Sequence, residues 1–153
     1  MKFSPKQLSF LKEMYVARIA TRSPDGALNV SPIYFANDAH SIFFATEYTS
    51  RKFKNLSLVP EAALSIDYFD ASWLHTGKYN AGKIKRNDDL WTVERALIVR
   101  GRARIFKDGQ STGYRRMYRL LFDKYPDYRK QKWKRGESPI IRISARSISS
   151  WGI

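Results

Sequence analysis

Residues 41–69, "SIFFATEYTSRKFKNLSLVPEAALSIDYF", contain two apolar segments with a short basic segment between them. The first and last segments are rich in aromatic and branched side chains, which is typical of β-strands. The segment between them is predicted to form a helix, because Thr49 and Ser50 are both good N-caps and Pro60 prevents its continuation. This stretch therefore predicts a strand, a short helix and a second strand.

The start of the predicted helix carries a concentration of positive charge. Arg51, Lys52 and Lys54 follow the N-cap residues, although the N-terminus of a helix already bears a partial positive charge. Hydroxyl groups, backbone N–H groups and cations at one helix end form a good site for a phosphate. The segment therefore fits either a phosphate-binding site or a solvated basic helix end.

Outward from this stretch, the hydrophobic pattern predicts a mainly β fold with short helices. Six strands are predicted, at residues 15–23, 27–36, 41–46, 62–69, 94–106 and 139–151. Helices are predicted at 5–14, ahead of Pro60 and at 113–125, with partly helical structure at 127–138. Gly101 inside its strand indicates a β-bulge or a close backbone approach. We expect residues 1–153 to form one domain, an antiparallel barrel with an insertion at about 70–93.

Composition limits the kinds of site that the chain can build. There is no Cys, and the only histidines are His40 and His75, so disulfides and thiolate metal sites are excluded and an all-His metal site is not expected. The chain has 28 Lys and Arg against 14 Asp and Glu, a net charge of +14, which attracts nucleic acid, anionic lipid or phosphorylated small molecules. The opening residues lack the apolar run of a signal peptide, and no stretch is long enough to span a membrane. We therefore expect a soluble, cytoplasmic protein.

The order of these segments resembles that of one known family. An Asp-Gly turn leads into "LNVSPIYF" at 28–35, "FFAT" at 43–46 leads into "SRK" at 50–52, and "VRGRA" at 99–103 forms a later Val-x-Gly-x-Ala strand. This ordered set, over about residues 10–107, resembles the FMN-binding split-barrel family of pyridoxamine 5′-phosphate oxidase relatives. The resemblance implies a six-stranded antiparallel split β-barrel that holds FMN in a groove at a homodimer interface.

The resemblance also implies which residues contact the flavin. The implied set is Val30, Ser31, Pro32 and Ile33 beside the isoalloxazine ring, Ala45 and Thr46 as the next contact pair, Ser50, Arg51 and Lys52 as the phosphate grip, and Trp151 from the partner subunit. The phosphate grip is the segment that the electrostatic argument selects independently. No catalytic acid or base is assigned, because the flavin ring itself carries the hydride or electrons.

The implied function is that of an FMN-dependent oxidoreductase acting on an unidentified small molecule, with NAD(P)H as candidate reductant. Pyridoxamine 5′-phosphate oxidase activity itself is not expected. Ala96 stands where a glutamine is common in the oxidases, and the chain ends in "SSWGI" instead of an Arg-Leu-His-rich tail. A reductase that uses a deazaflavin coenzyme and a non-enzymatic flavin carrier are alternatives, because both need the same phosphate grip.

A fourth hypothesis is a nucleic-acid-binding β-barrel without enzymatic activity. The segment "YRKQKWKRGE" at 128–137 mixes cations with Tyr128 and Trp133. Cations interleaved with aromatic rings can bind single-stranded nucleic acid through its phosphates and by base stacking. A solvated basic helix is the alternative interpretation of the same residues.

Two further segments have more than one interpretation. The insertion contains Trp73, Trp91 and His75, and it is either a lid over the flavin or a surface or dimer-contact loop. His75 is either within reach of a bound substrate or simply solvated. The apolar stripe over 114–125 is predicted to pack in the core or at a dimer contact.

Overall fold

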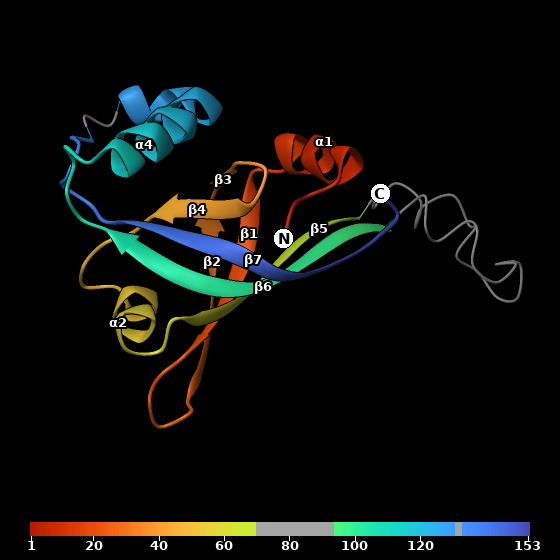
Figure 1. Ribbon diagram of the computed structural model, residues 1–153, viewed down its shortest axis with the longest axis horizontal. Helices are drawn as coiled ribbons and strands as arrows, with labels where there is room; N and C mark the ends of the chain where they lie inside the picture. Colours follow the sequence, from red (N-terminus) through yellow and green to blue (C-terminus); the bar gives the residue numbers. More distant parts are fainter. Residues whose placement is uncertain (70–93, 131–132) are drawn as a thin grey trace, which may run out of the picture.

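The computed structural model describes residues 1–69, 94–130 and 133–153. Within these ranges the strands form one antiparallel sheet in the order β2-β1-β5-β6-β7-β4-β3, which curls round on itself (Figure 1). The strands are β1 (Val16–Arg22), β2 (Leu28–Tyr34), β3 (Ala36–Asn37), β4 (Ser41–Ala45), β5 (Glu61–Phe69), β6 (Glu94–Phe106) and β7 (Ile140–Trp151). The predicted mainly β split barrel is confirmed, and the sheet has seven strands where six were predicted.

The additional strand arises from a break inside the predicted strand 27–36. β2 stops short of the predicted end, and the two-residue β3 then pairs with β4, with Ala36 opposite Phe43. Phe35 lies between the two strands and is fully buried, and its backbone N–H donates to the hydroxyl oxygen of Tyr125 at 3.0 Å. Because a side chain satisfies this N–H, the chain can leave one part of the sheet and enter another.

Short helices flank the sheet at the predicted places. Within the described ranges they are α1 (Pro5–Glu13), α2 (Arg51–Leu58), α4 (Thr112–Lys124) and the 3₁₀ helix η2 (Pro126–Arg129). Ser4 caps α1 and forms both hydrogen bonds of a capping box with Gln7. Ser50, one of the two predicted candidates, caps α2. In the segment 127–138, predicted to be partly helical, the structure has η2 at the beginning and no helix at 133–138.

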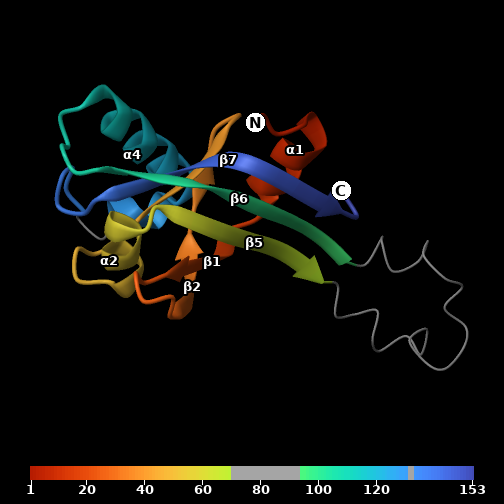
Figure 2. The same cartoon turned by 60° about the horizontal axis from the view of Figure 1, so that its bottom comes forward.

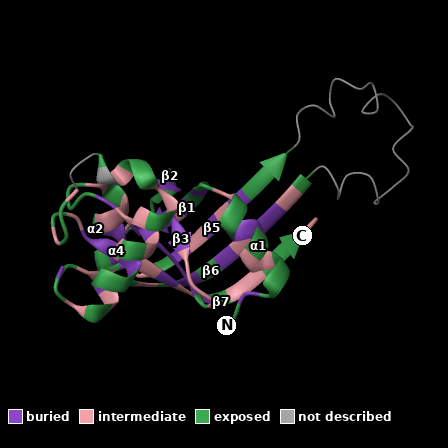
Figure 3. Ribbon diagram, turned by 90° about the horizontal axis from the view of Figure 1, so that it is seen from above, coloured by how far each residue is buried: buried purple, intermediate pink, exposed green. Residues whose placement is uncertain are grey.

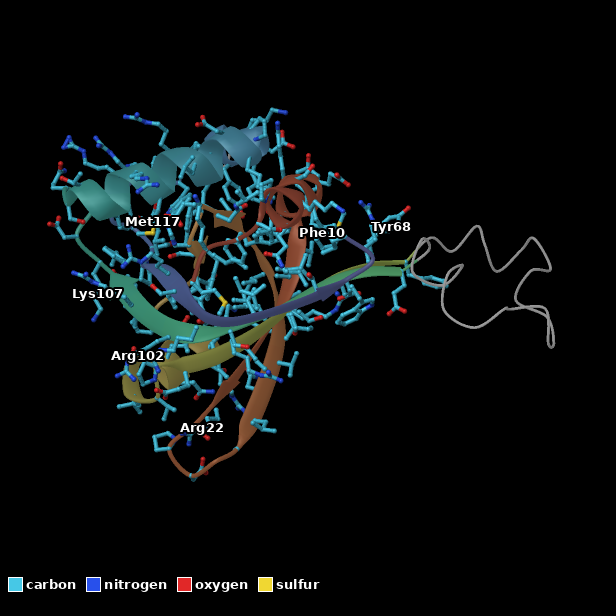
Figure 4. The ribbon with its side chains drawn as sticks, turned by 45° about the vertical axis from the view of Figure 1, so that its right-hand side comes forward. Phe10, Arg22, Tyr68, Arg102, Lys107 and Met117 are labelled. Atoms are coloured by element: carbon cyan, nitrogen blue, oxygen red, sulfur yellow. The ribbon has the colours of Figure 1, made fainter. Side chains whose placement is uncertain are left out.

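Two apolar clusters fill the space on either side of the curled sheet. Phe10 of α1 and Leu56 of α2 pack into the larger cluster with the inward side chains of the strands. Tyr114, Met117 and Leu121 of α4 form a second cluster against β3, β4 and the start of β7. Figure 3 shows the buried strands between exposed helix surfaces, and Figure 4 shows Met117 pointing from α4 towards the sheet. The predicted stripe on this helix is therefore core packing.

The long strands β5, β6 and β7 lie side by side, as Figure 2 shows. The pairing of β6 with β7 shifts register between Arg100 and Gly101, which confirms the predicted bulge. A Cβ at Gly101 would collide with the carbonyl oxygen of Ser144 and lie 2.8 Å from Cγ2 of Ile143. Glycine is therefore required here by close backbone approach.

The predicted insertion at 70–93 lies outside the described residues, together with His75 and the lid hypothesis. In the part of the chain that the structure describes, no helix is both long and apolar enough to cross a membrane.

Candidate functional site

The first turn of α2 brings hydroxyl groups and cations together just after β4, across the short connection visible in Figure 1. The Oγ of Ser50 accepts a hydrogen bond from the N–H of Phe53 at 3.3 Å and lies 3.0 Å from the Oγ1 of Thr46. Thr46 is buried, and its N–H donates to the carbonyl oxygen of Pro139 at 3.2 Å. The helix cap is therefore tied to the sheet through a second hydroxyl.

A groove of about 870 Å³ opens on one side of this turn, and we name it the main groove. Its lining residues are Pro32, Ile33, Tyr34, Ala45, Thr46, Glu47, Tyr48, Thr49, Ser50, Lys52, Tyr128, Trp133, Glu137 and Ser138. They come from the end of β2, the end of β4, the start of α2 and the chain around η2 and before β7. Its volume lies within the range of cofactor sites.

A second hollow of about 540 Å³ lies between the β1–β2 turn and α2, and we name it the turn hollow. It is lined by Ser23, Asp25, Ala27, Leu28, Asn29, Thr49, Arg51, Lys54 and Asn55. Thr49 lines both spaces, so the two meet at the start of the helix. Lys52 lines the main groove, whereas Arg51 and Lys54 line the turn hollow.

The cations of this turn have no acidic partner among the residues that the structure describes. The first turn of α2 contains no acidic residue. Within the described ranges, Arg51, Lys52 and Lys54 form no ion pair. An anion bound between them would offset their repulsion and the unfavourable interaction with the helix dipole.

The carboxylates near the turn, by contrast, are held by groups of their own loops. Glu47 accepts a hydrogen bond from Thr49 Oγ1 at 3.3 Å, and Glu137 accepts one from the N–H of Lys134 at 2.9 Å. In the turn hollow, Asp25 accepts from the hydroxyl of Ser23, and this hydrogen bond lowers the pKa of that carboxyl group. The carboxylates are therefore positioned by local donors and leave the three cations available to a ligand.

Aromatic rings from β2, η2 and the chain after it form one wall of the main groove. The ring centroids of Tyr34 and Tyr128 lie 6.5 Å apart, and those of Tyr128 and Trp133 lie 5.8 Å apart, both in edge-to-face contact. Burial raises the pKa of Tyr128 to about 12, so this phenol stays neutral at ordinary pH. The wall is therefore uncharged and suited to a flat ring.

The structure brings most of the residues of the predicted site together. Pro32, Ile33, Ala45, Thr46, Ser50 and Lys52 line the main groove, and Arg51 lines the adjoining turn hollow. Val30 and Ser31 do not line either space: Val30 faces outward, and the Oγ of Ser31 is buried without a hydrogen-bond partner in the described residues.

The aromatic wall was not predicted to belong to this site. Tyr128 and Trp133 were placed in a basic, nucleic-acid-binding segment, and Tyr34 had no assigned role. Their spacing along the chain gives no sign that they meet, because Tyr34 ends β2 whereas the other two follow α4. For Tyr128 and Trp133, aromatic character between cations was the one available signal.

Trp151 lies away from the main groove of its own chain. It pairs with Ala96 at the end of β7, whereas Ile140 at the start of β7 pairs with Ala45 in the groove wall. At about 3.3 Å per residue, Ile140 and Trp151 are about 36 Å apart along the strand. Trp151 therefore belongs to the opposite end of the sheet from the groove.

The arrangement can accommodate a flat ring beside the aromatic wall and an anionic group at the start of α2. It offers little to a metal ion: in the described part of the chain, no group of three or more His, Cys, Asp and Glu is arranged to hold one. The donor set consists of hydroxyls, cations and backbone groups, which suits a phosphate.

Several solved structures share this fold. The heme storage protein HutZ from Vibrio cholerae matches with a TM-score of 0.71 and 14% identity, over 100% of this chain and 97% of that one. An FAD-binding protein from Mesorhizobium loti matches with a TM-score of 0.67 and 15% identity, over 99% and 96% of the two chains. An F420 reductase matches with a TM-score of 0.59 and 22% identity, over 92% and 94%. At these identities the likeness shows the fold alone.

No curated protein sequence matches the chain. The family profile described as pyridoxamine 5′-phosphate oxidase matches residues 3–152, a range that contains both the main groove and the turn hollow. The match extends over nearly the whole sequence and agrees with the split-barrel topology. The chain therefore belongs to the pyridoxamine 5′-phosphate oxidase family.

Proposed function

We propose that this protein is a flavin-dependent oxidoreductase that binds FMN and acts on a small molecule yet to be identified. The observation that carries the proposal is the set of hydroxyls at the start of α2 together with cations that form no ion pair with a described residue. Ser50 and Lys52 line the main groove, and Arg51 lines the turn hollow beside it. A ligand with a flat ring and a terminal phosphate matches an aromatic-walled groove that has Lys52 at the start of α2 and Arg51 in the adjoining hollow.

The groups in the site fit this ligand. Arg51 would bind two phosphate oxygens at once, Lys52 would add a compact charge, and the Ser50 hydroxyl would donate to a third oxygen. The backbone of Pro32 and Ile33 and the pair Ala45 and Thr46 would orient the ring. The bound flavin supplies hydride or electron transfer, and the side chains position it and exclude water.

A homodimer with the flavin at its interface is part of the proposal. The outward residues of β2 form an exposed apolar row, with Leu28 80% exposed, Val30 64% and Tyr34 57%. Such a row on the edge of a sheet favours pairing with another chain. A second copy would also bring its Trp151 to a groove that the chain's own Trp151 lies far from.

Pyridoxamine 5′-phosphate oxidase activity itself is not part of the proposal. Ala96 occupies the position of a glutamine that is common in the oxidases, and its methyl group is buried, with 1% of the residue exposed. It offers no side-chain hydrogen bond to a flavin. We therefore expect a different substrate from that of the oxidases.

The test is to identify the molecule that the purified protein releases on denaturation, by absorbance, fluorescence and mass spectrometry. The Arg51→Ala/Lys52→Ala variant is measured beside it, with Arg115→Ala/Arg119→Ala as a matched loss of two cations from the exposed surface of α4. FMN in the wild type and the control, and its loss from the Arg51→Ala/Lys52→Ala variant, would support ligand and site together.

Other outcomes would replace the proposal. A released deazaflavin would retain the phosphate site and change the chemistry to obligate hydride transfer. A released heme would overturn the flavin assignment. A colourless protein that also fails to bind added FMN would make a nucleic-acid-binding protein the leading hypothesis.

Turnover separates an enzyme from a flavin carrier. We expect NAD(P)H to reduce the bound flavin faster than it reduces free FMN, as measured by the loss of flavin absorbance without oxygen. Equal rates would favour a carrier. The proposal places the enzyme in the cytoplasm, where NAD(P)H is available as reductant.

A further inference from the structure

Two arginines lie directly opposite each other on neighbouring strands, outside the main groove and the turn hollow. Arg104 of β6 pairs in register with Arg142 of β7. Like charges at directly opposed positions of an antiparallel sheet destabilise it. The free-energy cost of this repulsion is small only where another interaction offsets it.

One aromatic ring holds both guanidinium groups. The Cζ of Arg104 lies 5.0 Å from the centroid of the Phe106 ring, and the Cζ of Arg142 lies 5.3 Å from it. Cation–π attraction of this kind positions a guanidinium without using its N–H donors. Phe106 is in turn held by α4, because Gly113 leaves room for its ring: a Cβ there would lie 2.8 Å from Cε1 of Phe106. The two guanidinium groups therefore lie close together beside the Phe106 ring.

No acceptor in the described part of the protein satisfies either guanidinium. The Nε of Arg142 is buried without a hydrogen-bond partner, and neither arginine forms an ion pair with a described residue. A neighbouring arginine on the same strand is different, because Arg102 pairs with Glu61 at 2.8 Å. Figure 4 shows Arg102 and Lys107 at this end of β6. The opposed pair is thus cationic, lies beside the Phe106 ring and has no carboxylate partner among the described residues.

We propose that Arg104, Arg142 and Phe106 form a binding site for a phosphate group. A guanidinium presents a planar fork that donates two hydrogen bonds to a phosphate, and two guanidiniums can neutralise its two charges. The bound anion would offset the cross-strand repulsion. The phosphate belongs either to a small phosphorylated molecule or to a nucleic-acid backbone, which share this chemistry. The site does not depend on the flavin proposal.

The test is a titration of the full-length protein with inorganic phosphate, with sodium chloride at matched ionic strength as reference. Binding is followed by NMR through the Nε–Hε signals of the arginine side chains. We expect phosphate to shift the Arg142 and Arg104 signals selectively. Arg104→Gln should weaken this binding about tenfold or more, because a charge-assisted pair of hydrogen bonds is lost. Arg119→Gln, on the exposed surface of α4, is the matched control and should bind as the wild type does.

Arg142 is half-buried, so an Arg142→Gln variant that fails to fold would not test the site. A second measurement therefore follows the thermal stability of the Arg104→Gln variant. Arg104 is exposed, so Arg104→Gln is expected to fold, and without phosphate it should melt at the same temperature as the wild type or higher. Phosphate should raise the melting temperature of the wild type more than that of this variant. Equal responses to phosphate and chloride, or a wild-type response in Arg104→Gln, would overturn the site.

The Arg51→Gln/Lys52→Gln variant distinguishes phosphate binding at this site from phosphate binding at the start of α2. In this variant, phosphate should still shift the NMR signals of Arg104 and Arg142. Loss of these shifts in that variant would assign the response to the groove and overturn the proposal. A ten-nucleotide oligo(dT) distinguishes the sources. Tighter binding than phosphate, with a steep salt dependence, would identify a nucleic-acid backbone. Binding no tighter than that of phosphate would identify a small phosphorylated molecule.

Discussion

The hydroxyl oxygens of Thr46 and Ser50 lie 3.0 Å apart, joining the end of β4 to the N-cap of α2. One side chain therefore has two roles. Ser50 satisfies the N–H of Phe53 within the helix, and it also lines the main groove beside Lys52. The same hydroxyl contributes to the stability of the fold and lies in the proposed phosphate site.

The Ser50→Ala variant should lose both contributions. We expect a loss of about 1 kcal/mol in the free energy of unfolding, the usual cost of an N-cap serine, together with weaker FMN binding. Urea unfolding and a flavin fluorescence titration measure the two effects. Ser4→Ala removes the corresponding cap of α1, away from the groove, and should reduce stability without changing the FMN affinity. Equal FMN affinity in the two variants would argue against a role for Ser50 in binding.

The exposed apolar row on β2 is expected to be covered by a second copy of the chain. Val30→Lys should convert the protein to a monomer, because a charge buried in such an interface lacks a partner. Light scattering after size-exclusion chromatography measures the mass, and Leu58→Lys, at an exposed leucine on α2, is the control. A wild-type protein that is already monomeric would contradict the proposed dimer, as would a dimeric Val30→Lys variant.

A mixed dimer tests whether Trp151 acts in the partner's groove. One chain carries Trp151→Ala and the other carries Arg51→Ala/Lys52→Ala. If Trp151 acts across the interface, the mixed dimer has one intact site and should bind one FMN. If it acts within its own chain, both sites are impaired and FMN binding should be lost. The distance of about 36 Å along β7 predicts the first result, and flavin absorbance per dimer measures it.

Lys124 should make stability depend on pH between about 8 and 10. Its Nζ donates to the carbonyl oxygen of Leu11 at 2.9 Å and lies 3.9 Å from the centroid of the Phe35 ring. Burial lowers the pKa of Lys124 to about 8, whereas an unfolded lysine keeps its proton to about pH 10.4. The unfolded state binds more protons in this window, so the free energy of unfolding should rise with pH. The rise has a ceiling of about 3 kcal/mol, which solvent screening of the partly exposed amine reduces.

Lys124→Met is the control for this pH dependence, because it keeps an apolar stem and removes the titrating amine. Urea unfolding at pH 7, 8, 9 and 10 should show the rise in the wild type and a smaller one in the variant. Above pH 10 stability should fall in both, because burial raises the pKa of Tyr125 and Tyr128 and the unfolded tyrosines lose their protons first. The same rise in both proteins would assign it to other groups.

Most of the fold is predictable from local patterns in the sequence. The cap at Ser4, the end of α2 before Pro60 and the apolar stripe of α4 each depend on residues within a few positions of one another. The bulge at Gly101 was also predictable, since a glycine inside a strand signals close backbone approach. The break that creates β3 was not predictable, because the Phe35 N–H is satisfied by Tyr125, 90 residues away.

The strands, the helices and the charge at the start of α2 follow from the local sequence, because hydrophobic period, capping and helix dipole act over a few residues. Tertiary packing sets which space each of those charges lines. It directs Lys52 into the main groove and Arg51 into the turn hollow. It also places Trp133 in the groove wall and sets Arg104 opposite Arg142. The physical reason is that strand register and helix packing bring together residues whose separation along the chain carries no local signal.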